Sequence, residues 1–176
     1  AGQLVQTVAT CFERFQLKNR YLLFECVDVL TSALGPALAD EAIFGKLTQP
    51  LANMWARTED DSPLIYPLFA CMSGICSAVG NMIMPLAPTL FERCIKICQI
   101  IGPMRAEALR KANNDPDEAN LPPDTEEFLV ASVDLLSGLF EALGTSIEPL
   151  IQKAGSQQVM QIFMYCADEV NAQIRT

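Results

Sequence analysis

The apolar residues of this chain recur at helical spacing along most of its length. The clearest example covers residues 125–144, where apolar side chains stand at Phe128, Leu129, Val133, Leu135, Leu136, Leu139, Phe140 and Leu143. Residues three or four apart lie on one face of a helix, and a glycine such as Gly144 commonly ends one. This stretch is therefore predicted to be one amphipathic helix.

Similar patterns predict helices over residues 3–15, 20–34, 41–57, 63–79, 85–101 and 147–154, and a last one from residue 156. Proline removes a backbone donor, so Pro50 is expected to bend the third helix and Gly102-Pro103 to interrupt the fifth. The last helix is expected to break near Asp168. Residues 113–124 have no apolar period and contain three prolines, so they are predicted to form a loop.

Three of the predicted helices finish alike, with SALG at 32–35, SAVG at 77–80 and EALG at 141–144. The last two are followed by the same G-x-x-I-x-P-L pattern. The glycines are 45 and 64 residues apart, and the longer interval contains the polar loop and its basic flank. Without that insertion of roughly 20 residues, the period matches the ~40–47 residues of HEAT or armadillo repeats.

This period predicts an all-α fold, an α-solenoid in which antiparallel helical hairpins stack into a right-handed superhelix. The expected repeats are 3–35, 36–80, 81–144 and a truncated 145–176. Natural arrays carry polar caps at their ends, and neither end of this sequence has one. We therefore expect a section of a longer solenoid, forming a single HEAT-repeat segment over residues 1–176.

Composition narrows the range of partners. The net charge of −9 argues against a nucleic-acid surface, which needs clustered lysine and arginine, and favours a basic protein or peptide. There is no uninterrupted run of 18 apolar residues and no secretory start, so a soluble chain without membrane insertion is expected. The seven cysteines are odd in number and lie mostly in apolar segments, which favours free thiols in a reducing compartment.

The chain contains no histidine, which removes the usual general base and the commonest metal ligand. No enzyme activity and no cofactor are expected. Cys94 and Cys98 are one helical turn apart and could contribute to a metal site, but two further ligands would be needed and core packing is the simpler interpretation. Trp55 is interpreted chiefly as a packing residue.

Acidic residues interrupt the apolar pattern on the helices that end at the repeated glycines. Seven residues separate successive members of Glu127, Asp134 and Glu141, so they form one stripe with about 10 Å between members. Glu25 and Asp28 lie away from the apolar face of the helix at 20–34. If equivalent helices stack side by side, these acids converge on a groove. The alternative is that they only solvate an exposed helix face.

The helix at 63–79 would lie between the two acidic helices. It carries a strip of small residues: Ala70, Ser73, Gly74 and Ser77. Small side chains allow a backbone to come close, so this strip is predicted to admit an extended chain.

Several segments, in order, resemble the central HEAT repeats of the transportin family of β-karyopherin nuclear import receptors. They are FERFQLKN, LLFECVDVLTSALG, PLANMW, IYPLFACMSGI, FERCIKICQ, EEFLVASVDLLSGLFEALG and IEPLIQ. The resemblance implies a receptor that shuttles between cytoplasm and nucleus. Its concave face, lined by the second helix of each repeat, would bind basic, extended nuclear localisation signals of the proline-tyrosine type. Ran-GTP would release the cargo, and nucleoporins would be further partners, mostly through regions outside this chain.

The resemblance also implies site residues. Three acidic positions would meet the basic part of the cargo signal, at Glu25, Glu127 and Asp134. Neighbouring apolar contacts would come from Val29, Val130 and Ala131. Ser32 and Ala70 depart from the family pattern, because related receptors look acidic there, so the groove carries less charge and the cargo preference is expected to shift. A HEAT-repeat scaffold for protein complex assembly, without a transport role, is the alternative interpretation.

Overall fold

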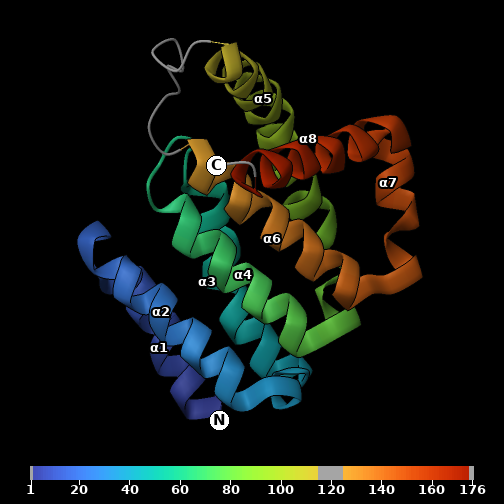
Figure 1. Ribbon diagram of the computed structural model, residues 1–176. Coiled ribbons are helices and arrows are strands. Elements are labelled where there is room, and N and C mark those ends of the chain that lie inside the picture. Colours follow the sequence, from blue (N-terminus) through green and yellow to red (C-terminus); the bar gives the residue numbers. More distant parts are fainter. Residues whose placement is uncertain (1, 115–124, 175–176) are drawn as a thin grey trace.

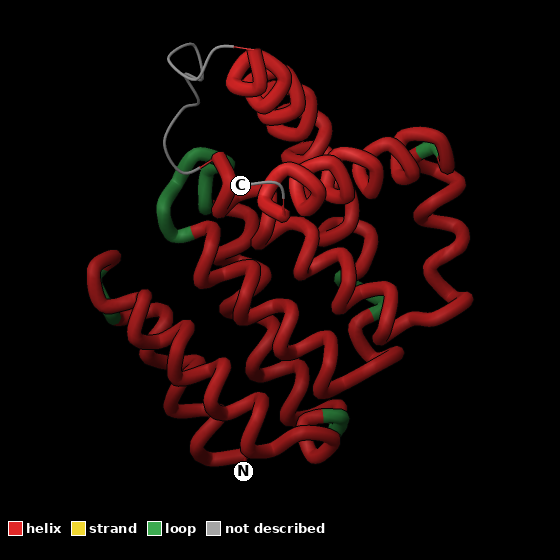
Figure 2. The backbone as a smooth tube through the Cα atoms, in the orientation of Figure 1, coloured by secondary structure: helices red, strands yellow, loops and turns green. Residues whose placement is uncertain are grey.

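The computed structural model describes residues 2–114 and 125–174, and these form helices joined by short turns (Figures 1 and 2). No strand occurs within these two ranges, which confirms the all-α prediction. The α-helices are α1 (Gly2–Arg14), α2 (Leu17–Leu34), α3 (Glu41–Arg57), α4 (Ile65–Val79), α5 (Ala87–Asn114), α6 (Thr125–Leu143), α7 (Glu148–Ala154) and α8 (Ser156–Ile174).

The helices form two layers. One layer, in front in Figure 1, contains α2, α4 and α6 side by side, with α4 packed against both neighbours. The other layer contains α1 and α5. Helix α1 packs on α3, whereas α5 packs on α6 of the front layer and on α8. Each hairpin therefore covers the apolar face of the next, as expected of a HEAT-repeat α-solenoid, and this part of the prediction is confirmed. The division into repeats at particular residues stays a prediction.

The recurring glycines mark a recurring turn. Gly35, Gly80 and Gly144 follow α2, α4 and α6 with φ angles of 48°, 55° and 52°. Each glycine opens a four-residue 3-10 helix that leads into the next hairpin. Positive φ is strained for residues with a Cβ, so glycine is the residue that can leave the helix in this direction. The repeated sequence thus encodes a repeated change of chain direction.

The core lies between the two layers. Its largest fully buried side chains include Phe24, Phe69 and Phe91, contributed by α2, α4 and α5. Trp55 is 5% exposed and stacks on Phe69 with ring centroids 4.8 Å apart, so its role in packing is confirmed. Four cysteines also lie in the core: Cys71, Cys76, Cys94 and Cys98. Burial raises the pKa of the Cys98 thiol to about 12, as expected of a thiol surrounded by apolar groups.

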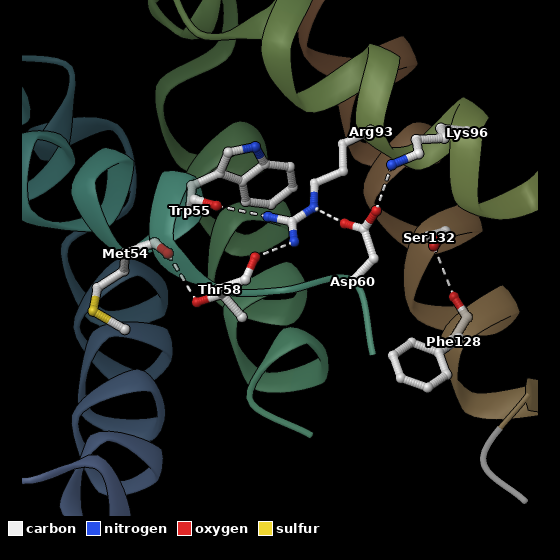
Figure 3. Close-up of polar contacts among 8 residues, drawn as sticks. All are labelled: Met54, Trp55, Thr58, Asp60, Arg93, Lys96, Phe128 and Ser132. Atoms are coloured by element: carbon white, nitrogen blue, oxygen red, sulfur yellow. Dashed lines mark hydrogen bonds and ion pairs between the residues drawn. The ribbon is translucent and has the colours of Figure 1, made fainter. Parts of the chain in front are cut away.

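A clamp around Arg93 joins α5 to the turn between α3 and α4 (Figure 3). The Arg93 guanidinium donates to the Asp60 carboxylate at 2.7 Å, to the Trp55 carbonyl at 2.7 Å and to the Thr58 carbonyl. It also lies over the Trp55 ring, 5.0 Å from the centroid. Lys96 Nζ is 2.8 Å from the second Asp60 oxygen. Burial would raise the pKa of Asp60, but the hydrogen bonds from Lys96 and Arg93 outweigh it and hold that pKa below its usual value.

The expected break at Gly102-Pro103 was wrong, because α5 is continuous from Ala87 to Asn114. Tertiary contacts flank the expected break. The ring of Tyr165 on α8 packs directly on Gly102, and Arg105 bonds to Thr125 and Glu126 at the start of α6. The expected break near Asp168 was also wrong, since α8 continues to Ile174. Most of the predicted 113–124 loop lies outside the described residues.

Among the described residues, three stretches are long and apolar enough to cross a membrane by length and composition alone: Asn19–Leu38, Ile65–Ile83 and Thr125–Ala154. Each one runs past a positive-φ glycine into a 3-10 helix. Each also contains one of the three helices that pack side by side in the front layer. The expectation of no membrane insertion stays a prediction from the sequence.

Candidate functional site

A groove of about 850 Å³ opens between the first turns of α4 and the first half of α6. We call it the α4–α6 groove; its lining residues are Tyr66, Pro67, Ala70, Glu126, Glu127, Val130, Ala131 and Asp134. It brings together four of the six residues predicted to contact cargo: Glu127, Val130, Ala131 and Asp134. Glu25 and Val29 do not line it.

The α6 wall of the groove is one face of that helix. Glu127, Val130, Ala131 and Asp134 are spaced by three, four and seven residues from the first, so they share one helix face. Residues on the other side of α6, such as Leu136, are buried in the core. Val130 remains 52% exposed. The groove therefore presents apolar surface between two acidic positions.

The α4 wall is mainly apolar. Tyr66 packs against Phe128 of α6 with ring centroids 4.6 Å apart. Pro67 stands in the first turn of α4, where a missing backbone N–H costs no helical hydrogen bond. Ala70 adds only a methyl group and leaves the groove open.

The three carboxylates of the groove differ in their partners. Glu126 is paired with the guanidinium of Arg105 at 3.1 Å, and the Arg105 side chain is only 7% exposed. Glu127 and Asp134 form no ion pair with any residue in the described ranges 2–114 and 125–174. Both are exposed. Their negative charge is therefore available to a cationic ligand.

Behind the groove, α4 and α6 approach closely. Ser73 Oγ donates to the backbone carbonyl of Asp134 at 3.3 Å. A Cβ on Gly138 would lie 2.9 Å from the same hydroxyl, closer than such atoms tolerate. Gly138 therefore allows the two helices to pack at this distance, and the Ser73 bond helps to fix the backbone that carries Asp134.

The seam between α2 and α4 is built in the same way. A Cβ on Gly74 would lie 3.0 Å from Thr31 Oγ1 and 3.1 Å from Asp28 Oδ1. Two members of the small-residue strip, Ser73 and Gly74, thus serve contacts between helices. That the strip lets an extended chain come close stays a prediction; of its four residues, Ala70 lines the groove.

Glu25 and Val29 lie on α2, one helix away from the groove, and both are exposed. Their relation to the α4–α6 groove becomes clear when α2, α4 and α6 are aligned on the glycine that follows each helix. Glu25, Ala70 and Asp134 each stand ten residues before Gly35, Gly80 and Gly144 respectively. They form one row across the front layer, acidic at both ends and neutral in the middle, which we call the acidic row. Glu141 is exposed but lies outside the groove lining.

A second row was missed by the sequence reasoning. Tyr21, Tyr66 and Val130 each stand fourteen residues before the same three glycines. All three are partly or fully exposed, with Tyr21 at 39%. An alignment on the glycines would have revealed this apolar row. No comparable signal identifies the pairing of Glu126 with Arg105, because it depends on how α5 and α6 meet.

Stacked hairpins with side-by-side helices in one layer define the class as an α-solenoid of HEAT repeats. The chain is similar to importin subunit beta-2 of Schizosaccharomyces pombe, with 30% identity over 172 residues. It is also similar to transportin of Dictyostelium discoideum, with 30% identity over 148 residues, and to transportin-1 of Homo sapiens, with 26% over 172. These matches cover 98%, 84% and 98% of this chain. The resemblance to transportin, a β-karyopherin, is thereby confirmed.

The chain spans only 18%, 16% and 18% of the length of these three relatives. No protein-family model matches it.

Proposed function

We propose that this chain forms part of the cargo groove of a nuclear import receptor and binds a basic, extended signal of the proline-tyrosine type. The observation that carries the proposal is the α4–α6 groove, where Glu127 and Asp134 flank exposed apolar surface. The names of the similar proteins, transportin and importin, support the transport role.

The proposed recognition combines charge and apolar contact. A lysine or arginine of the signal would place its charged end near Glu127 or Asp134 while its aliphatic stem lies over Val130 and Tyr66. Long side chains of this kind bury methylene groups and keep the charge in water. The carboxylates would also accelerate association by steering, an effect that weakens as salt is raised.

The acidic row extends the groove across the layer. Glu25 and Val29 on α2 would contact a part of the signal beyond the α4–α6 groove, and Ala131 would add apolar contact within it. At Ala70 the row offers no charge, so the segment of the signal that crosses α4 would not need to be basic.

The remaining properties concern the whole receptor. We propose that Ran-GTP releases the cargo, that nucleoporins bind mainly through other regions, and that the receptor shuttles between cytoplasm and nucleus without enzymatic activity. The repeats would be 3–35, 36–80 and 81–144, with 145–176 opening a fourth. A scaffold without a transport role would hold its partners regardless of Ran-GTP, so nucleotide-dependent release in the full-length receptor tests this part.

The test of the groove is a titration of a basic proline-tyrosine signal peptide, followed by fluorescence anisotropy. Replacing Glu127 and Asp134 together by alanine is expected to weaken binding about tenfold at low salt, since each exposed pair contributes up to ~1 kcal/mol. The control replaces Glu141 and Glu148, two exposed acids outside the groove, and thus removes the same charge. Equal affinities of the two double variants would remove the site assignment.

A further inference from the structure

Two arginines converge at the edge of the molecule where α1 ends, α2 begins and α3 ends. Arg20 of α2 and Arg57 of α3 both line two cavities of about 170 and 280 Å³, which also share Met54. Phe12 and Pro50 add apolar walls to the larger cavity. This place is separate from the α4–α6 groove, with which it shares no lining residue.

Neither arginine is neutralised by a residue that the structure describes. The Nε atom of Arg20 is buried and has no hydrogen-bond partner. Within residues 2–114 and 125–174, neither Arg20 nor Arg57 forms an ion pair, although the chain carries 21 acidic residues. A buried donor without an acceptor is costly, and an arginine without one is uncommon in a folded protein.

The clamp around Arg93 shows how the same chain treats arginine elsewhere. There, Asp60 supplies an internal carboxylate to both Arg93 and Lys96. Around Arg20 and Arg57 the nearest acid in the lining is Glu59, an exposed residue that lies beyond ion-pair distance of both. The first site is complete without a ligand, whereas the second has donors and space, and no described residue forms an ion pair with either arginine.

We propose that Arg20 and Arg57 form a binding site for a phosphate group. Each guanidinium presents N–H donors in a planar fork that matches two oxygens of an oxyanion. Two converging forks call for more than two acceptor oxygens, which a tetrahedral phosphate offers and a carboxylate does not. The combined cavity space holds several water molecules of ~30 Å³ each, enough for such a group. The phosphate is either free or carried by a side chain of a partner.

The test follows the arginine Nε–H signals of the ¹⁵N-labelled protein by NMR during addition of inorganic phosphate at constant ionic strength. The Arg20 signal, assigned with an Arg20→Lys variant, is expected to shift saturably. Arg57→Met is expected to weaken phosphate binding about tenfold, because a hydrogen-bonded charged partner is lost. Glu59→Gln is expected to strengthen it by removing a nearby negative charge.

Lys46→Met is the matched control, since Lys46 is an exposed cation on α3 that lines neither cavity. The proposal is overturned if the Arg20 signal does not move, if Arg57→Met and Lys46→Met bind phosphate equally, or if acetate shifts the signal as strongly as phosphate. A phosphoserine peptide that binds more tightly than inorganic phosphate identifies a modified partner. Tighter binding of inorganic phosphate identifies the free ion, and either result supports the site.

Discussion

Replacing Arg93 by methionine is expected to destabilise the fold strongly while leaving the groove residues in place. Methionine keeps the length of the aliphatic stem but cannot donate to Asp60, Trp55 or Thr58. The Arg93 side chain is only 12% exposed, so water replaces these bonds incompletely. The two carbonyls and the Asp60 carboxylate would lose their shared donor.

The size of the effect follows from these contacts. A hydrogen bond to a charged group contributes ~1.5–3 kcal/mol, and bonds made by one side chain are not additive. Asp60 is 38% exposed and keeps its contact with Lys96, which limits the cost of its lost partner. Loss of the contact with the Trp55 ring adds ~0.5–1 kcal/mol. A loss of about 3 kcal/mol in the free energy of unfolding is therefore expected, or roughly 6–12 °C in Tm.

Urea denaturation followed by far-UV circular dichroism measures the free energy, and fluorescence of Trp55, the single tryptophan, reports on the clamp itself. Arg110→Met is the control on the same helix, because Arg110 is exposed and, among the described residues, pairs with Glu107. That variant should change stability by less than ~0.5 kcal/mol. A loss of the same small size in Arg93→Met would refute the view that the clamp joins α5 to the α3–α4 turn.

Three further outcomes are expected. Gly102→Ala should destabilise the fold by ~1–3 kcal/mol in thermal denaturation, because its Cβ would lie 2.6 Å from the Tyr165 ring. Gly45→Ala, whose Cβ would have nothing within 4 Å, should stabilise the fold by ~0.5–1 kcal/mol. Equal effects of the two variants would contradict the packing of Tyr165 on Gly102. Ala70→Glu should strengthen binding of a basic signal peptide up to about fivefold at low salt, and a Gln variant with the same gain would exclude a charge effect. Because the pKa of Asp60 is lowered by folding, its charge stabilises the fold above the unfolded pKa and loses this effect as pH falls through the folded pKa. The difference in the free energy of unfolding between wild type and Asp60→Asn, measured by urea titration, should thus stay constant near neutral pH and shrink at acid pH. A difference that persists at acid pH would contradict a stabilising role of the Asp60 charge.

Periodicity predicted the elements well where apolar spacing and glycine coincide. The helix that ends at Gly144 and the helix over residues 41–57 were found as predicted, because burial of one face determines both. The break at Gly102-Pro103 failed for a physical reason: residues far along the chain, Tyr165 and Glu126, contact α5 on both sides of the expected break, and the helix is continuous. Local propensity contains no information on such contacts.

The candidate site was predicted only in part for a similar reason. Helical spacing placed Glu127 and Asp134 on one face without knowledge of the fold, and the family resemblance added Val130. Whether a carboxylate on that face is free depends on neighbouring helices, and Arg105 neutralises Glu126 but does not reach Glu127. The role of Gly74 at a seam between helices likewise required the packing of α2 against α4.

The positive-φ turns at Gly35, Gly80 and Gly144 also determine the spacing at which a bound peptide would contact successive helices. Because each turn leaves its helix in the same direction, equivalent residues of α2, α4 and α6 repeat at the spacing of packed helices, ~8–10 Å. An extended chain advances ~3.3–3.6 Å per residue, so about three residues pass between one helix and the next. The front layer would then contact every third side chain of a peptide laid across it. The spacing of residues in the peptide, as much as its composition, would decide whether it fits.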